Sequence, residues 1–304
     1  MKSFVLGCLG LTFLSLGASP AALAEGLPPE WTLAGQEKTC AGGAQERAFT
    51  LVAREHVVPV GMGYRADVMA LDGVGTAPII EACEGDRVTL TLRNEGKMAH
   101  GIDSHAFFVS PERFGPVDSG GTLSYSGVMK VPGTFMFHCA SGATTDVHIK
   151  SGMFGAMIVY PRKPFRRATE IAVLQGGFWG EPSGDGLIEA DTNRIMQNNP
   201  FTLAFNGRLE HDPVHAHAGD LVRVYFVNAG PGASSVHVMG TMLDRFYDSG
   251  NPADALRDVQ TGLVPAGSGA TFELRLPEKG MYMLVDHDNL RFLPLGMGIG
   301  IMAD

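Results

Sequence analysis

The chain has 304 residues, with 23 Lys and Arg against 32 Asp and Glu, so its formal net charge at pH 7 is −9. An acidic protein gains no counterion release from a nucleic acid backbone, and we therefore exclude nucleic acid as a partner. Glycine and proline are frequent, at 40 and 18 residues, which favours short strands joined by turns over a helical fold.

Residues 1–24 have the pattern of a secretory signal peptide. Lys2 precedes an apolar stretch that begins at Phe4, and small residues lead to Ala24. We expect cleavage after Ala24 and export of the mature protein. The apolar stretch is too short to cross a membrane, and no later segment approaches the length of a spanning helix, so no membrane span is expected.

The mature sequence consists of β-rich runs separated by Gly, Pro and Asn, and no long amphipathic helix pattern interrupts them. In the N-terminal half we predict strands at 48–52, 86–93, 122–131, 134–138 and 155–160. After a linker rich in Pro and basic residues at 161–164, we predict strands at 170–174, 221–227, 270–276, 281–285 and 298–302.

The two halves resemble each other in sequence. EGDRVTLTLRNEG (84–96) matches AGDLVRVYFVNAG (218–230), and GAMIVYP (155–161) is echoed by GIGIMAD (298–304). The period of about 135–145 residues is too long for a solenoid repeat and indicates a duplicated domain. We predict an all-β protein of two tandem Greek-key β-sandwiches, with domain 1 at 25–163 and domain 2 at 164–304.

Of the four cysteines, Cys8 falls in the leader, which leaves three. In an oxidising compartment an odd number implies one thiol with a separate role, and Cys139 is the candidate. Cys40 and Cys83 can either form a disulfide or remain two buried thiols, because the sequence does not supply their geometry.

Cys139 begins a pattern of metal ligands. Eight residues separate it from His148, and four more separate His148 from Met153. Together with His100, these residues offer a thiolate, two imidazoles and a thioether, the soft mixed set that suits copper in an electron-transfer site. A buried core thiol or core methionine is the ordinary interpretation of either residue alone, but the joint spacing favours copper.

His105 and His138 are then left over. Neighbours in a strand point to opposite sides, so His138 turns its imidazole away from a metal bound by Cys139. We therefore predict a second copper, separated from the first by a single peptide bond. Two imidazoles are too few for a catalytic copper, which usually takes three protein ligands and keeps one position open.

Four motifs together resemble the copper-containing nitrite reductases, two-domain cupredoxin enzymes of the periplasm: HGIDSH (100–105), the loop from His138 to Met153, SSVHVMG (234–240) and LVDHDN (284–289). The resemblance covers nearly the whole mature chain. It implies an electron-accepting type 1 copper and a catalytic type 2 copper in each chain. The implied type 1 ligands are His100, Cys139, His148 and Met153, and the implied type 2 ligands are His105, His138 and His287.

The resemblance also implies an assembly, a reaction and a partner. The family takes the ligand that matches His287 from a neighbouring subunit, so a homotrimer is expected. The family reduces nitrite with one electron and two protons to nitric oxide and water. The expected electron donor is a small periplasmic cupredoxin or cytochrome c.

Further residues match positions that the family uses around the nitrite site. Asp103 and His237 match the groups that handle protons, as general acid catalysis would require. Met239 matches the bulky residue that caps the site. Met242 stands where the family often has a further histidine, which is a departure from the pattern.

Two other functions remain open. The two coppers could serve an oxidase or reductase of another small substrate, or the protein could be a non-catalytic copper or electron carrier. Asp103 and His237 favour an enzyme, because a carrier needs no proton donors. A trinuclear oxidase cluster needs four His-X-His pairs, whereas this sequence has one, at His215 and His217, where we expect an exposed strand.

The methionines other than Met153 are expected to serve a different purpose from copper binding. Met281 and Met283 lie in an apolar strand pattern, where the ordinary role of the side chain is to fill gaps in the core.

Overall fold

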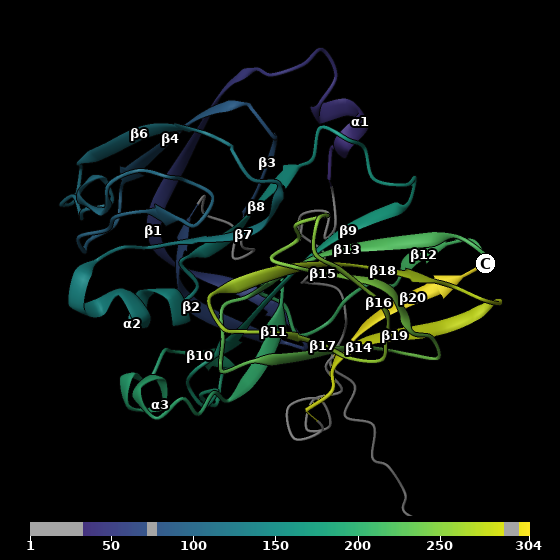
Figure 1. Ribbon diagram of the computed structural model, residues 1–304. Coiled ribbons are helices and arrows are strands. Elements are labelled where there is room, and N and C mark those ends of the chain that lie inside the picture. The colour runs from purple at the N-terminus through teal and green to yellow at the C-terminus, as the bar shows by residue number, and fades with distance from the viewer. Residues whose placement is uncertain (1–32, 72–77, 289–297) are drawn as a thin grey trace, which may run out of the picture.

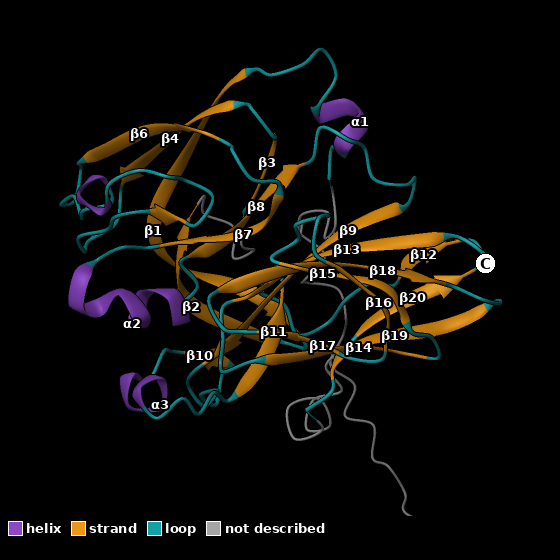
Figure 2. Ribbon diagram, in the orientation of Figure 1, coloured by secondary structure: helices purple, strands orange, loops and turns teal. Residues whose placement is uncertain are grey.

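The computed structural model describes residues 33–71, 78–288 and 298–304. Within these residues the chain is built mainly of strands, and its short helices lie at the periphery (Figure 2). The prediction of an all-β protein is confirmed. The predicted leader at 1–24 lies outside the described residues. Within the part of the chain that is described, no helix has the length and apolar character needed to cross a membrane.

The N-terminal half contributes the following elements: α1 Gln36–Thr39, β1 Glu46–Gly61, β2 Tyr64–Leu71, β3 Ile79–Cys83, β4 Arg87–Asn94, β5 Asp103–Ser104, η1 Pro111–Arg113, β6 Thr122–Val128, β7 Gly133–His138, η2 Gly142–Thr144, α2 Thr145–Lys150 and β8 Phe154–Tyr160.

The C-terminal half contributes β9 Thr169–Phe178, β10 Leu187–Ile188, α3 Thr192–Met196, β11 Thr202–Phe205, β12 Val214–Ala216, β13 Leu221–Asn228, β14 Ser234–Met239, β15 Leu243–Asp248, β16 Ala255–Val259, β17 Gly262–Val264, β18 Ser268–Arg275, β19 Gly280–Asp286 and β20 Ile299–Ala303.

These strands form two sandwiches (Figure 1). In the first sandwich, the sheet β10-β2-β1-β4-β6 packs on the sheet β3-β8-β7-β5. In the second, β11-β9-β13-β18-β15-β16 packs on β12-β20-β19-β14-β17. The predicted strands are all present, and the fold is cupredoxin-like. Additional strands join them, such as β2 and β15, which the sequence analysis did not identify.

Strand alternation explains how the first core forms. In β4, the side chains of Val88, Leu90 and Leu92 are fully buried, whereas the residues between them face outward. The buried side chains meet Phe137 of β7 and Met157 of β8 in one apolar cluster. Because side chains alternate along β4, its apolar face packs on the sheet that contains β7.

A further apolar cluster lies between the two sandwiches. Met136 of β7 and Ile158 of β8 pack with Leu174 of β9 and Val227 of β13. In Figure 1, β7 and β8 lie on the side of the first sandwich that faces the second. Strand β7 is thus packed on both faces, which holds the segment that leads into Cys139.

The hairpin of β1 and β2 extends beyond the first core. Leu51 of β1 belongs to the first core, but Val58 and Val60, farther along the same strand, belong to the core of the second sandwich. Val68 of β2 joins them there, and Leu209 donates its N–H to the carbonyl of Val60. The C-terminal half of β1 therefore serves the other sandwich.

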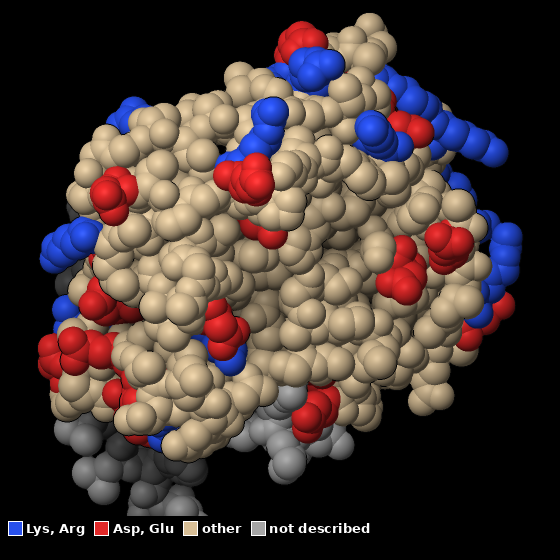
Figure 3. Space-filling view, turned by 60° about the vertical axis from the view of Figure 1, so that its left-hand side comes forward, with Lys and Arg blue, Asp and Glu red and all other residues tan. Residues whose placement is uncertain are grey.

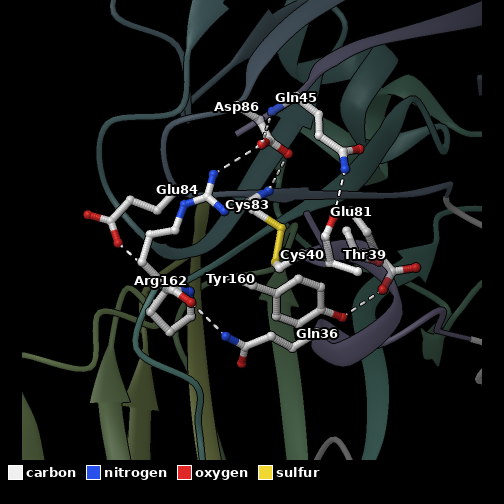
Figure 4. The surroundings of a disulfide bond; sticks show 12 residues. Gln36, Thr39, Cys40, Gln45, Glu81, Cys83, Glu84, Asp86, Tyr160 and Arg162 are labelled. Atoms are coloured by element: carbon white, nitrogen blue, oxygen red, sulfur yellow. Dashed lines mark hydrogen bonds and ion pairs between the residues drawn. A yellow bond between two sulfur atoms is a disulfide. The ribbon is translucent and has the colours of Figure 1, made fainter. Parts of the chain in front are cut away.

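A disulfide joins Cys40 to Cys83 with a Cα–Cα distance of 5.7 Å, so the segment around α1 is tied to β3 (Figure 4). Asp86 lies beside it with a fully buried side chain. Its carboxylate accepts N–H groups of Gln45 and Cys83 and pairs with Arg47. Burial opposes ionisation of Asp86, but these partners prevail and hold its pKa below the usual range.

Charged side chains of both signs are interspersed on the face shown in Figure 3, and the centre of that face is largely uncharged. Opposite charges pair across the surface, as in Arg54 with Glu95 and Arg65 with Asp185. Pairs this exposed add little to stability.

Candidate metal centres

Three side chains of the first sandwich converge on one point. Cys139 directly follows β7, and its Sγ lies 3.6 Å from Nδ1 of His100 and 3.4 Å from Nδ1 of His148. The three ligand atoms all lie within 4.8 Å of one another, and all three residues are buried. The arrangement offers one sulfur and two nitrogens to a single small ion.

The loop between β7 and β8 brings these groups together. After Cys139 the chain turns through η2 and α2, where His148 lies, and returns to Met153. Cys139 donates its N–H to the carbonyl of Met153 at 3.0 Å, and Met153 donates its N–H to that of His148, also at 3.0 Å. His100 is held by a bridge to Val117. Met153 is fully buried, and its backbone is hydrogen-bonded to that of Cys139.

Gly101 allows the backbone to approach the sulfur. A Cβ at this position would lie 2.3 Å from the carbonyl oxygen of Phe114 and 2.4 Å from that of Ala140, so no larger residue fits. Burial raises the pKa of the Cys139 thiol, although hydrogen bonds from Gly101 and Ser141 to the sulfur act against it. A metal that binds here must therefore displace a thiol proton.

The buried imidazoles of His100 and His148 differ in the hydrogen-bond partner of the nitrogen that faces away from Cys139. Nε2 of His100 lies 3.2 Å from Oε1 of Glu55, a residue of β1 that the sequence analysis missed. Glu55 also accepts the N–H groups of Lys97 and Met98. Burial resists ionisation of Glu55, yet these bonds hold its pKa below the usual range. Nε2 of His148 is buried and has no hydrogen-bond partner among the described residues.

A second cluster lies on the other side of the β7 terminus. Asp103 of β5 pairs in antiparallel register with His138 of β7, and its Oδ2 lies 4.0 Å from Nε2 of that histidine. Nε2 of His105 lies 3.1 Å from the same nitrogen. His138 donates its Nδ1–H to the carbonyl of Cys139 at 2.9 Å, which leaves the lone pair of Nε2 for a metal.

The second sandwich brings two further histidines together. His237 of β14 and His287, which directly follows β19, have ring centroids 5.0 Å apart and nearly perpendicular rings. Nδ1 of His237 donates to the carbonyl of Gln260 at 2.8 Å. Within the described residues neither histidine joins the cluster around His138. Within one chain, this histidine pair is therefore separate from the cluster around His138.

Large apolar side chains are exposed on the sheet face that carries His237. Met239 follows it on the same side of β14 and is 49% exposed, and Leu263 on the neighbouring β17 is 62% exposed. Met242, just beyond β14, is also 49% exposed. An exposed apolar patch of this kind is typical of a surface that another chain covers.

The predicted core position of Met281 was wrong, because its side chain is 50% exposed and Met283 is only partly buried. Both lie on the outer face of β19, whereas Tyr282 and Leu284 fill the core. Every residue in this stretch is apolar, so the sequence could not indicate which alternate set faces inward. The expected exposed strand at His215 is present as β12.

Comparisons with known proteins place the chain in a family. A profile of the multicopper oxidase family matches residues 52–164. The copper-containing nitrite reductase of Neisseria meningitidis serogroup A is 31% identical over 251 residues, which cover 76% of this chain and 62% of that protein. The structure of the copper nitrite reductase of Nitrosomonas europaea is 30% identical with a TM-score of 0.77, covering 86% of this chain and 94% of that one. The chain belongs to the family of copper-containing nitrite reductases.

The copper nitrite reductase of Thermus scotoductus is 28% identical, with a TM-score of 0.76 over 85% of this chain and 62% of that one. The chain thus spans about three fifths of the length of the Neisseria and Thermus relatives. A multicopper oxidase structure that is 22% identical, with a TM-score of 0.75, shares the fold alone.

In the present chain, the residues of both clusters fit copper. The first has a sulfur and two imidazole nitrogens and is buried, which is the donor set and dry environment of a copper electron-transfer site. The second has two imidazoles, with the carboxylate of Asp103 beside them, and is open to solvent on the side of His105. Harder donors with solvent access suit a metal that must also bind a substrate.

Proposed function

We propose that this protein is a periplasmic copper-dependent nitrite reductase, which uses one electron and two protons to convert nitrite to nitric oxide and water. The observation that carries the proposal is the joining of a buried cluster and an open cluster by the single peptide bond between His138 and Cys139. An electron received in the dry site has a short covalent path to the site that substrate can reach.

In this proposal each chain holds two coppers, which supply the one-electron redox chemistry when bound. The type 1 copper has His100, Cys139, His148 and Met153 as ligands, and the type 2 copper has His105, His138 and His287. Burial of Cys139 keeps nitrite away from the first site. Exposure of His105 leaves the second site accessible. The type 1 site lies in a first domain at 25–163, and His287 belongs to a second domain at 164–304.

Asp103 and His237 supply the protons. The carboxylate of Asp103 lies close to Nε2 of His138, within reach of an anion that approaches the same cluster, so it can hold or pass on a proton there. His237 stands beside His287 and can resupply that proton. Met239 projects from the same strand as His237 and caps the substrate position.

The separation of the two histidine groups supports a homotrimer. The cluster around His138 has an incomplete set of ligands for a catalytic metal, and His287 lies in the other sandwich. A head-to-tail ring brings the second sandwich of one chain against the first sandwich of the next. The exposed apolar patch at Met239 and Leu263 supports such a contact, because it lies on the sheet face that carries His237.

Export and electron supply complete the proposal. The leader at 1–24 directs the protein to the periplasm. A small cupredoxin or cytochrome c of that compartment delivers the electrons, one for each nitrite reduced.

Purified protein tests the reaction directly. We expect two coppers per chain, an intense visible band from the Cys139 thiolate, and nitric oxide from nitrite with a reduced electron donor. Cys139→Ala should abolish the band and the turnover while one copper per chain remains. His215→Ala, on the exposed β12, is the control and should change neither. A protein with both coppers and the band that forms no nitric oxide would contradict the reaction and favour an electron carrier.

A further inference from the structure

We propose that Glu55 is a positioning residue for the first copper: its carboxylate, bonded to the outer nitrogen of His100, lowers the reduction potential of the metal. The inference rests on the proposed function, because it takes His100 and Cys139 as ligands of an electron-accepting copper. Glu55 does not touch the ligand atoms themselves and acts through the His100 imidazole.

The geometry gives His100 two distinct nitrogens. Nδ1 faces the sulfur of Cys139 at 3.6 Å, and Nε2 faces Oε1 of Glu55 at 3.2 Å on the opposite side of the ring. His100 is fully buried, and the side chain of Glu55 is 17% exposed. With Nδ1 on the metal side, Nε2 carries the hydrogen and donates it to the carboxylate.

The chain around residues 96–98 is shaped to hold this carboxylate. Lys97 donates its N–H to Oε2 of Glu55 at 2.9 Å, and Met98 donates to Oε1 at 3.3 Å. A Cβ on Gly96 would lie 2.8 Å from Oε1, so the carboxylate occupies space that only a glycine leaves free. Glu55 is therefore fixed in place by backbone groups that also favour its charged form.

A fixed anion on the far side of an imidazole ligand changes the metal in a definite direction. The carboxylate polarises the Nε2–H bond and makes Nδ1 a stronger donor. It also attracts the more highly charged oxidised copper more strongly than the reduced copper. Nε2 of His148 has no such partner among the described residues, so within this part of the chain the effect on the copper comes through His100 and Glu55. A lower potential favours passage of the electron onward to the site of nitrite reduction.

The test measures the reduction potential of the first copper by redox titration of its visible band. Glu55→Gln keeps an oxygen that can accept the His100 hydrogen but removes the charge, so the potential should shift to a more positive value with the band retained. Glu95→Gln is the matched control, because Glu95 lies near the same loop and loses the same charge but pairs with Arg54 and Arg93. Its potential should stay at the wild-type value.

Gly96→Ala provides a second, independent variant. The added Cβ pushes the Glu55 carboxylate away without changing any charge, and the potential should again become more positive. Wild-type potentials in both variants would overturn the proposal. So would loss of the band in both variants while Glu95→Gln retains it, since Glu55 would then hold the site together rather than tune it. A wild-type protein without a visible band would instead refute the proposed function.

Discussion

The hydroxyl oxygens of Thr134 and Thr271 lie 2.7 Å apart, and this hydrogen bond crosses the buried contact between the two sandwiches. Thr134 belongs to β7 and Thr271 to β18, and both are almost fully buried. The bond therefore ties the second sandwich to the strand that ends in His138 and Cys139.

Removing one of the two hydroxyls should lower the stability of the protein more than removing both. Thr134→Val leaves Thr271 buried without this partner, which should lower the free energy of unfolding by about 1–3 kcal/mol. Thr134→Val combined with Thr271→Val replaces both groups by methyls of similar shape and should recover most of that loss. Chemical unfolding of Thr134→Val, Thr271→Val and the double variant measures the effect, and a double variant as unstable as the sum of the two single variants would contradict it.

The disulfide should be a major source of stability for the N-terminal segment. It joins residues that are 43 positions apart. The chain-entropy relation for a closed loop of that size gives about 4 kcal/mol. Cys40→Ala combined with Cys83→Ala should lose a stabilisation of that order in chemical unfolding, while the visible band persists because Cys139 is outside the bond. A variant as stable as the wild type would show that the segment is held by its other contacts alone.

Asp86 should make stability depend on acid pH. Its pKa is lower in the folded protein than in the unfolded chain, so its stabilisation is complete above the unfolded value and is lost as the pH falls through the folded value. The wild type should therefore exceed Asp86→Asn in thermal stability at pH 7, and the difference should shrink below about pH 4. Melting temperatures across pH 3–7 would test this, and a difference that grows on acidification would contradict the assignment.

Complementation between two inactive variants tests the shared site. His287→Ala and His138→Ala should each remove nitrite reduction, because each deprives the second copper of one ligand. In mixed trimers some interfaces receive His138 from one chain and His287 from another, and activity should return in part. The measurement is nitric oxide formation after mixing under conditions in which subunit exchange is independently verified. Continued inactivity would argue that each site is built within one chain.

The two proton-handling residues should affect rate rather than metal content. Asp103→Asn keeps the shape of the side chain but removes the titrating group, so turnover of nitrite should fall by on the order of 10²–10⁴-fold with both coppers retained. His237→Ala should behave similarly. His215→Ala, a histidine paired with Asp304 on the exposed β12, serves as the control. Wild-type turnover in both variants across pH 5–8 would refute the proposed reaction.

The strands and the ligand motifs could be read from local sequence because both depend on short-range spacing. The buried alternation of Val88, Leu90 and Leu92 is visible in the sequence as a period of two. The distances from Cys139 to His148 and Met153 are set by one loop between adjacent strands. Such features need no knowledge of the tertiary fold.

Features that depend on strand pairing could not be predicted. Glu55 meets His100 only because β1 and β4 run side by side in the same sheet, and the two residues are 45 positions apart. No spacing rule connects them. Met281 shows the opposite difficulty, since an uninterrupted apolar run has two equivalent faces until the neighbouring strands decide which one is covered.

Strand β1 packs into the apolar cores of both sandwiches. Its first part completes one apolar core at Leu51, and its last part fills the other at Val58 and Val60. A fragment that begins at residue 164 would retain its own sheets but would lack these valines and would open an apolar surface to water. Loosening the N-terminal sandwich should therefore also expose apolar side chains in the core of the second sandwich, so we expect the two sandwiches to unfold together.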